Sequence, residues 1–509
     1  MFSSSMIILI LGSKMHLTKY YLQRRHLVVI LAFLGFANIY AMRANLSVAI
    51  VQMTSDTVVT TIDGEQVRKA EFEWDTVAQG AILGAFFYGY FLTQLPGGYL
   101  AHHYGGKFIY CTSVFGNSML SLAQTRDINN FDSLYLNTKF IFASNVSNWC
   151  CMRIPPYIIG TAVFTLLSPP LAKLGKGSLI TARFWEGLFE GISYPAMHTI
   201  LGNWAPTMEK TRMSAISYSG SYFGTVIAMP VSAIVGHHFG WPSIFYFFGI
   251  SALLWCFLWV KMFYDLPEND PNISTDELAL LKRETKQAAS SIVPWRRILS
   301  SKAVWAIVIA HVCQNWGFYI MLTSLPRIIE NSLSYDREEA GFLSSLPYFV
   351  MGTVLLTAGG FADYLRKSCM WSTTKARKVF CCLGLLGESA FLLLATAEMH
   401  KLLVLISLII SVGLGGLSWS AFSVNYLDIA PQYAGHLMGF SNTLATLPGM
   451  ISPLFVGAVV KNQLRSEWHA VFFFTSGIYI FGSFMFWLWA KGDLEEWSSH
   501  QAGLSQTDS

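Results

Sequence analysis

The feature that most restricts the fold of this chain is a series of long apolar runs along nearly its whole length. Eleven runs have about 20 predominantly apolar residues, the length that crosses the hydrocarbon core of a bilayer. Only 13% of the 509 residues are charged, about half the share in soluble proteins, so the apolar residues have to face lipid. The sequence therefore predicts an all-α membrane protein whose main surroundings are the lipid bilayer. The runs begin near Leu27, Val77, Gly177, Met213, Trp241, Ala303, Ala340, Val379, Lys401, Ala434 and Trp468.

The distribution of Lys and Arg predicts the orientation in the membrane. If the N-terminus is cytosolic and the spans alternate, roughly twenty of these residues fall in cytosolic segments and about nine on the other side. Cytosolic loops of membrane proteins are enriched in Lys and Arg. We therefore expect both termini in the cytosol and an even number of spans, with the twelfth between Gly106 and Ser168.

A polar stretch from about Asp265 to Lys302 divides the chain into two halves of six spans each. Within it, Ser274 and Glu277 have the spacing of a capping box at the start of a short helix. Both halves carry a glycine-containing helix end followed by a basic loop, at 98–107 and at 359–367. Such repeats are typical of transporters that have two helical bundles around a central site.

The predicted layout has five parts. A cytosolic N-terminus (1–26) precedes an N-terminal six-helix bundle (27–264). A cytosolic central loop (265–302) leads to a C-terminal six-helix bundle (303–490), and a cytosolic C-terminus (491–509) follows.

Other classes of function find little support in the sequence. The net charge of +4, without a basic tail, does not favour a nucleic-acid partner. The eight cysteines form no Cys-x-x-Cys pair and no Cys/His cluster, so we predict no metal site. No polar catalytic cluster stands out near one end of the spans, so we predict no catalytic residues. A polytopic membrane enzyme is kept as a remote alternative.

Ionisable side chains inside a span are costly and therefore point to function. Arg43 lies about 12 Å from the end of the first predicted span, which is far for a side chain that snorkels to the interface and favours an anion ligand. Glu388 is isolated in the ninth span, and packing and coupling roles stay equally open for it. The charged residues placed in spans are Arg43, Arg183, Glu186, Glu190 and Glu388.

Three of these residues belong to the fourth span. At 100° per residue, Arg183, Glu186 and Glu190 fall within an arc of roughly 60° and share one helix face. The neighbouring Gly187 and Gly191 would allow another helix to approach closely. Arg183 could hold a substrate carboxylate or phosphate, and either glutamate could take up a proton. The alternative for this cluster is an internal salt bridge that packs the bundle.

Seven stretches between the first and eleventh spans carry a family resemblance: YAMRANLSVAIV, FFYGYFLTQLPGGYLAHHYGGK, ARFWEGLFEGISYPAMH, VPWRRIL, GFLSSLPY, NYLDIAPQYAG and NTLATLPGM. They resemble the anion:cation symporter family of the major facilitator superfamily, which includes sialin, the vesicular glutamate transporters and the sodium-dependent phosphate transporters. The sialin-like members are most similar. The resemblance implies the major facilitator fold, with twelve transmembrane helices in two six-helix bundles.

The resemblance also implies roles for individual residues. Arg43 and Arg183 fall on family arginines that handle the anion, and Glu186 and Glu190 fall on glutamates tied to proton coupling. The seventh span has Asn315 where vesicular glutamate transporters carry an arginine, as sialin-like members do. We therefore count Asn315 among the substrate-binding residues. Loading of vesicles with glutamate is expected less than transport of another anion.

The third span departs from the family, in which this span is continuous. Residues 117–159 separate GKFIYCTSVFG from IIGTAVFTLLSP and include the polar stretches TRDINNFDS and NVSNWC. We interpret this segment as an atypical insertion that splits the third span, arising from a retained intron or an unusual isoform. A transcript that always carries the segment would contradict this origin.

These observations and the resemblance predict a secondary active transporter. It would move a small organic anion, sialic acid or another acidic sugar or carboxylate, together with protons by alternating access. The alternative is a sodium-dependent inorganic phosphate cotransporter, so the coupling ion is H⁺ or Na⁺; we expect no other cofactor. We expect a monomer in a lysosomal, vesicular or plasma membrane.

Overall fold

The computed structural model describes residues 23–54, 56–60, 66–94, 156–206, 209–264, 266–285, 293–368, 370–397, 400–462 and 464–498. The first half contains α2 (Arg24–Thr54), β1 (Asp56–Thr60), β2 (Gln66–Ala70), a helix at 76–94, α5 (Pro156–Leu174), α6 (Lys176–Glu190), α7 (Ser193–Trp204), α8 (Lys210–Phe239) and α9 (Trp241–Met262). The connecting segment contains η1 (Pro267–Asn269), α10 (Thr275–Thr285) and α11 (Trp295–Ser300).

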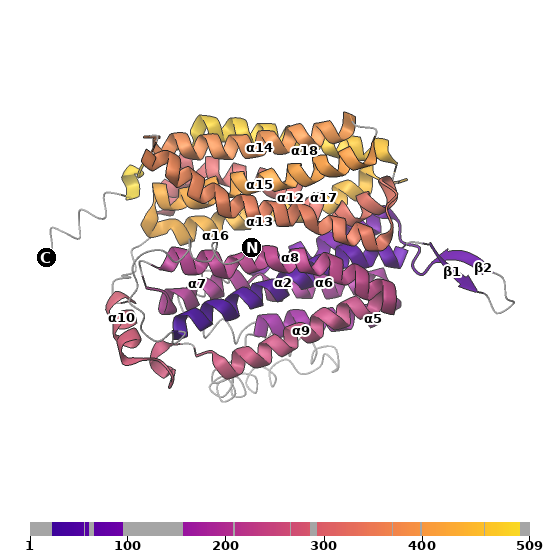
Figure 1. Ribbon diagram of the computed structural model, residues 1–509, viewed down its shortest axis with the longest axis horizontal. Coiled ribbons are helices and arrows are strands. Elements are labelled where there is room, and N and C mark those ends of the chain that lie inside the picture. The colour runs from indigo at the N-terminus through magenta and orange to yellow at the C-terminus, as the bar shows by residue number, and fades with distance from the viewer. Residues whose placement is uncertain are drawn as a thin grey trace, which may run out of the picture.

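The second half consists of helices. It contains α12 (Lys302–Arg327), the π-helical turn η2 (Ile328–Ser332), α13 (Arg337–Ser368), α14 (Thr373–Ala397), α15 (Lys401–Ile429), η3 (Pro431–Tyr433), α16 (Ala434–Leu444), α17 (Leu447–Val459) and α18 (Arg465–Trp489). Figure 1 shows the helices of the two halves as two layers lying side by side, with α10 at one end and the β1–β2 hairpin at the other. We call these the α10 end and the hairpin end.

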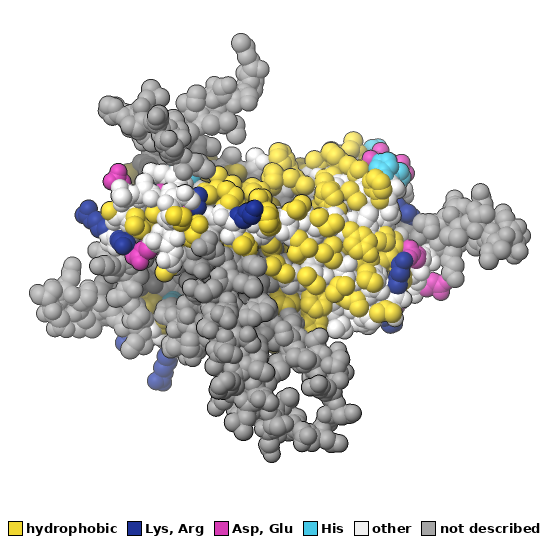
Figure 2. All heavy atoms as spheres, turned by 90° about the horizontal axis from the view of Figure 1, so that it is seen from below, with side chains coloured by type: hydrophobic (Ala, Val, Ile, Leu, Met, Phe, Trp, Pro, Cys, Tyr) yellow, Lys and Arg dark blue, Asp and Glu magenta, His cyan; other side chains and the backbone are white. Residues whose placement is uncertain are grey.

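The described helices confirm the predicted fold class. Nine of them are long and apolar enough to cross a membrane. The helix at 76–94, α5 and the consecutive pair α6–α7 take the three remaining places, which gives two bundles of six. Large apolar side chains cover much of the face in Figure 2, and α9 alone exposes Phe247, Ile250, Leu254 and Phe257. This face has the composition expected where helices contact lipid.

The second part of the split third span begins earlier than the sequence predicted. α5 starts at Pro156, a residue whose fixed φ suits the first turn of a helix, so residues 156–159 belong to the helix and not to the predicted insertion. The remainder of the predicted insertion, 117–155, lies outside the described residues.

Two local features were not foreseen. The loop after α2 forms an antiparallel hairpin in which Asp56 pairs with Ala70 and Thr60 with Gln66. The fourth span is interrupted at Gly191 and Ile192, where α6 ends and α7 begins. Strand formation fits the β-branched residues of the TVVT stretch, which lies outside the apolar runs that predicted helices.

The capping box predicted in the central loop is only half correct. The Ser274 hydroxyl accepts a hydrogen bond from the Glu277 amide at 3.3 Å, as expected. The Glu277 carboxylate, however, accepts hydrogen bonds from the backbone amides of Arg24 at 3.1 Å and Arg25 at 3.0 Å. It therefore caps the start of α2, where free amides and the helix dipole favour a negative charge. This contact anchors the central loop to the N-terminal bundle.

The two bundles are in close contact at the hairpin end. The Thr76 hydroxyl donates a hydrogen bond to the Gly457 carbonyl at 2.8 Å. A Cβ on Gly80 would lie 2.3 Å from the Pro453 carbonyl oxygen, and one on Gly341 would lie 2.2 Å from the Ala233 Cβ. Because these contacts join the N-terminal to the C-terminal bundle, the described structure is closed at the hairpin end.

Candidate functional site

A small cavity lies between the two bundles. Its volume is about 10 Å³, room for about one water molecule. Its lining comes from α2, the helix at 76–94 and α6 on one side and from α12 on the other. The lining residues are Arg43, Ser47, Leu83, Phe86, Phe87, Arg183, Leu322 and Thr323. Two predicted anion ligands, Arg43 and Arg183, therefore face one cavity at the bundle interface.

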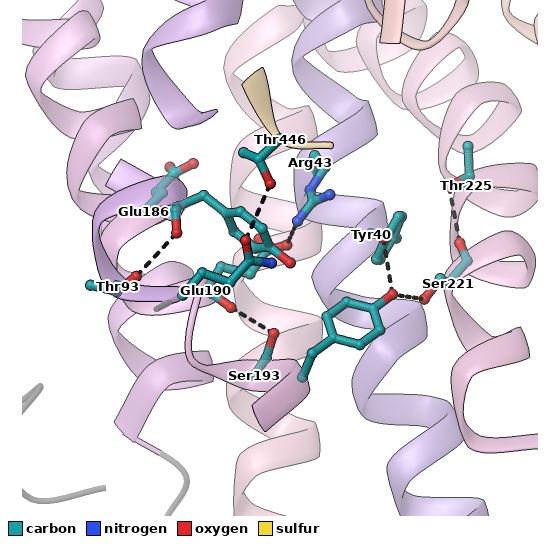
Figure 3. Close-up of polar contacts among 12 residues, drawn as sticks. Tyr40, Arg43, Thr93, Glu186, Glu190, Ser193, Ser221, Thr225 and Thr446 are labelled. Carbon is teal, nitrogen blue, oxygen red and sulfur yellow. Dashed lines mark hydrogen bonds and ion pairs between the residues drawn. The ribbon is translucent and has the colours of Figure 1, made fainter. Parts of the chain in front are cut away.

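Arg43 forms an ion pair with Glu190 across two helices of the N-terminal bundle. The guanidinium of Arg43 on α2 donates to the Glu190 carboxylate at the end of α6, and Figure 3 shows the two side chains pointing toward each other. Their side chains are only 4% and 1% exposed. The Arg43 Cζ also lies 4.5 Å from the Tyr40 ring centroid and 5.0 Å from that of Tyr90. Aromatic faces thus stabilise a cation that lipid would disfavour.

Arg183 forms a second ion pair with Glu186, one turn further along α6. The Ser168 hydroxyl of α5 donates a hydrogen bond to the Glu186 carboxylate at 3.3 Å. Phe86 connects the two pairs, because its ring centroid lies 4.7 Å from the Arg43 Cζ and 5.6 Å from the Arg183 Cζ. The shared helix face predicted for the fourth span is thus buried, and its two glutamates pair with different arginines.

Glycines bring α6 against the helix at 76–94, as the sequence predicted for Gly187 and Gly191. A Cβ on Gly187 would lie 1.9 Å from the Phe86 carbonyl oxygen, and one on Gly191 would lie 2.5 Å from the Tyr90 carbonyl oxygen. In the opposite direction, a Cβ on Gly89 would lie 2.0 Å from the carbonyl oxygen of Phe184. Only glycine permits this backbone approach, which places Phe86 and Tyr90 beside the charged residues.

The four charges balance, yet some of their polar atoms have no partner. Two guanidinium groups face two carboxylates, so the cluster has no net charge when all four groups are ionised. Among the described residues, no hydrogen-bond partner is present for the buried Arg43 Nε, Arg183 Nε or Glu190 Oε2. The described cluster thus has unsatisfied hydrogen-bond donors on both arginines and an unsatisfied acceptor on Glu190.

The structure does not bring the other two candidate residues to the cavity. Asn315 on α12 donates a hydrogen bond to the Ala445 carbonyl at 2.8 Å, between α16 and α17. Glu388 on α14 accepts a hydrogen bond from Gln314 at 2.8 Å inside the C-terminal bundle. Neither is among the residues that line the cavity. The substrate-binding role of Asn315 stays a prediction.

One further buried cation, Arg327, is not evident from the sequence pattern. Arg327 ends α12, and its residue is 5% exposed. Its Nη1 donates a hydrogen bond to the Gln79 side-chain oxygen at 3.0 Å. Arg327 is not among the charged residues that the sequence placed inside spans. Its position between the bundles follows from how the helices pack, and the order of apolar residues along the sequence does not predict that packing.

The sequence matches a known family and several of its curated members. The Major Facilitator Superfamily model covers residues 151–453. Sialin of Homo sapiens is 38% identical over 93% of this chain and 90% of its own length. The chain belongs to the anion:cation symporter branch of the Major Facilitator Superfamily. Vesicular glutamate transporter 2 of Bos taurus is 34% identical over 94% of the chain and 76% of its own length.

Solved structures of other superfamily members share the fold. A bacterial homologue of the human lysosomal transporter Spinster, in an inward-facing and occupied conformation, has a TM-score of 0.62 at 12% identity, covering 94% of this chain and 97% of that one. A D-xylose-proton symporter has a TM-score of 0.61 at 14% identity, covering 91% and 98%. This superfamily member is thus a multi-pass membrane transporter, and its relatives give the enzyme alternative no support.

Proposed function

We propose that this symporter moves a small organic anion, an acidic sugar such as sialic acid or another carboxylate, together with protons. The observation that carries the proposal is the pair of buried arginines, Arg43 and Arg183, each neutralised by a glutamate at one cavity between the bundles. Arginine suits this role because its planar guanidinium can donate two parallel hydrogen bonds to one carboxylate.

Charge balance provides the coupling. An anion that bound Arg43 while Glu190 stayed ionised would leave one uncompensated negative charge in the membrane. A buried charge without a partner costs several kcal/mol. Protonation of Glu190 removes that excess charge and releases Arg43 for the anion. The carboxylate of Glu190 and the carboxylate of the substrate thus compete for one guanidinium, so the anion and the proton enter together. Glu186 is the second proton acceptor in this proposal.

Alternating access follows from the size of the cavity. A cavity of about 10 Å³ cannot hold a sugar acid, so the substrate has to enter a conformation in which the bundles are further apart at one end. Rocking of two bundles about a central site is the general mechanism of transporters with this repeat architecture. The interbundle contacts at Thr76 and Gly80 are the ones that have to separate when the hairpin end opens.

The substrate class rests on similarity and on one residue. Human sialin is 38% identical and the vesicular glutamate transporters are 34% identical. The family resemblance places Asn315 where it expects an arginine in the latter. We therefore favour an acidic sugar over glutamate. The proposed location is a lysosomal or vesicular membrane, with the plasma membrane as the alternative, and the proposed state is a monomer.

Uptake into vesicles that contain the purified protein tests the proposal. Sialate, glutamate, urate and phosphate are each offered under a proton gradient without sodium, and under a sodium gradient without a pH difference. The proposal predicts sialate uptake driven by protons. Phosphate uptake that depends on sodium would instead establish the alternative, a sodium-dependent phosphate cotransporter. If none of the four anions is transported, the substrate class is wrong.

A further inference from the structure

Arg327 and Gln79 lie next to the central cavity on the side of the hairpin end. Arg327 follows the cavity-lining Thr323 by four residues on α12, and Gln79 precedes the cavity-lining Leu83 by four residues in its helix. Residues four apart share a helix face and are separated by about 6 Å along the axis. The hydrogen bond between Arg327 and Gln79 therefore crosses the bundle interface one turn beyond the cavity.

The charge of Arg327 has no acidic partner in the part of the chain that the structure describes. No carboxylate of the described residues lies within ion-pair distance of its guanidinium, in contrast to Arg43 and Arg183. The Trp468 ring lies 5.6 Å from the Arg327 Cζ, and its indole Nε1 is buried without a hydrogen-bond partner among the described residues. The surroundings thus offer hydrogen-bond donors and a positive charge, the combination that an anion requires.

The Arg327–Gln79 bond also has to break during transport. Arg327 belongs to the C-terminal bundle and Gln79 to the N-terminal bundle, so separation of the bundles at the hairpin end pulls the two groups apart. The guanidinium then loses its neutral partner and faces the opened pathway. A cation that is exposed only in this state attracts an anion arriving from the hairpin end.

We propose that Arg327 is a second anion-binding site, which takes up the carboxylate of the incoming solute at the hairpin end before the solute reaches Arg43 and Arg183. In the closed conformation, the Gln79 side-chain oxygen accepts a hydrogen bond from the guanidinium in place of the solute carboxylate. This inference rests on the proposed transport of a carboxylate. It assigns to Arg327 a role in capture from one side of the membrane and none in proton coupling.

Two substitutions distinguish anion capture by the Arg327 charge from a purely structural role, in which the hydrogen bond to Gln79 only holds the bundles together (a latch). Arg327→Lys keeps the positive charge, whereas Arg327→Gln loses the charge and retains a side chain that can hydrogen-bond to Gln79. A latch that depends only on the hydrogen bond predicts near-normal behaviour for Arg327→Gln. A capture site predicts the reverse order, with Arg327→Lys closer to the wild-type protein.

The assay measures initial rates of labelled sialate transport in vesicles of defined orientation, with sialate offered at the hairpin end or at the α10 end. We expect Arg327→Gln to raise the KM at the hairpin end by about tenfold or more, the effect of losing one charged hydrogen bond. The KM at the α10 end and the maximal rate should change less than about twofold. Arg327→Lys should stay within about threefold of wild type at both ends. Normal KM at the α10 end also shows that the variant is folded.

Each other result contradicts the inference. A wild-type KM for Arg327→Gln at the hairpin end excludes the capture site, and so does an equal rise at both ends, which would indicate a general structural defect. If the wild-type protein transports none of the tested anions, the proposed function fails together with this inference. If wild-type transport is intact and only the expected KM change is missing, the inference alone fails.

Discussion

Replacement of Glu190 by Gln is the perturbation whose effect follows most directly from the site. The substitution keeps the size of the side chain and removes the charge that neutralises Arg43, whose side chain is 4% exposed. Removing one partner of a buried ion pair costs about 3–5 kcal/mol of stability because it leaves the other charge uncompensated. A bound substrate carboxylate would restore the partner. We therefore expect the variant to be less stable without substrate and to gain more thermal stability than wild type when sialate is added.

Transport should change in a distinctive way. One proton coupled to one anion makes a gradient of one pH unit worth about 1.4 kcal/mol, or about tenfold accumulation. Because Glu190→Gln cannot release a proton, it should lose this accumulation and still exchange labelled for unlabelled sialate. Vesicle uptake with and without a pH difference, followed by counterflow, measures both properties.

The control is an exposed acid in the same protein. Glu268 pairs with Lys282 at the surface, with side chains 57% and 53% exposed, so Glu268→Gln should change stability by at most about 1 kcal/mol and leave transport intact. Tenfold accumulation by Glu190→Gln under one pH unit would refute the assignment of the coupling proton to Glu190.

Three further predictions concern other parts of the account. Gly187→Ala should destabilise the protein by about 1–3 kcal/mol or prevent its folding, because the new Cβ would meet the Phe86 carbonyl oxygen at 1.9 Å. A melting assay in detergent measures this. Gly177→Ala is the matched control, because a Cβ on Gly177 would have no atom within 4 Å. Glu277→Gln should lower stability by about 1 kcal/mol, since a neutral amide caps the start of α2 less well than a carboxylate; an unchanged melting temperature would contradict this capping role. Arg43→Lys should raise the sialate KM by about tenfold because an ammonium cannot replace the two-pronged guanidinium, and an unaltered KM would remove Arg43 from the binding site.

The sequence predicted much of the site because charges in apolar runs are rare and visible. Arg43, Arg183, Glu186 and Glu190 stand out in the spans, and 100° per residue places the last three on one face. The pairing pattern was not predictable in the same way. That Glu190 faces Arg43 depends on how α2 packs beside α6, a contact between residues 147 positions apart.

Other features depended on tertiary structure or on assumptions about composition. The apolar pattern did not point to Arg327, and only packing of α12 against the helix at 76–94 buries it. Glu277 had the spacing of a capping residue, but it caps α2 instead of its own helix. Hydropathy predicted the spans well because hydrocarbon accepts only satisfied backbone, a restriction that does not apply to the loop containing β1 and β2.

The most direct test of the central claim is to measure proton movement evoked by the anion. A pH-sensitive dye is sealed inside vesicles that contain the wild-type protein, sodium is omitted, the membrane potential is clamped, and sialate is added outside. The account predicts acidification of the interior that requires both sialate and an ionisable Glu190, because the anion enters only with a proton. Sialate uptake without any change in internal pH, or with a requirement for sodium, would contradict it.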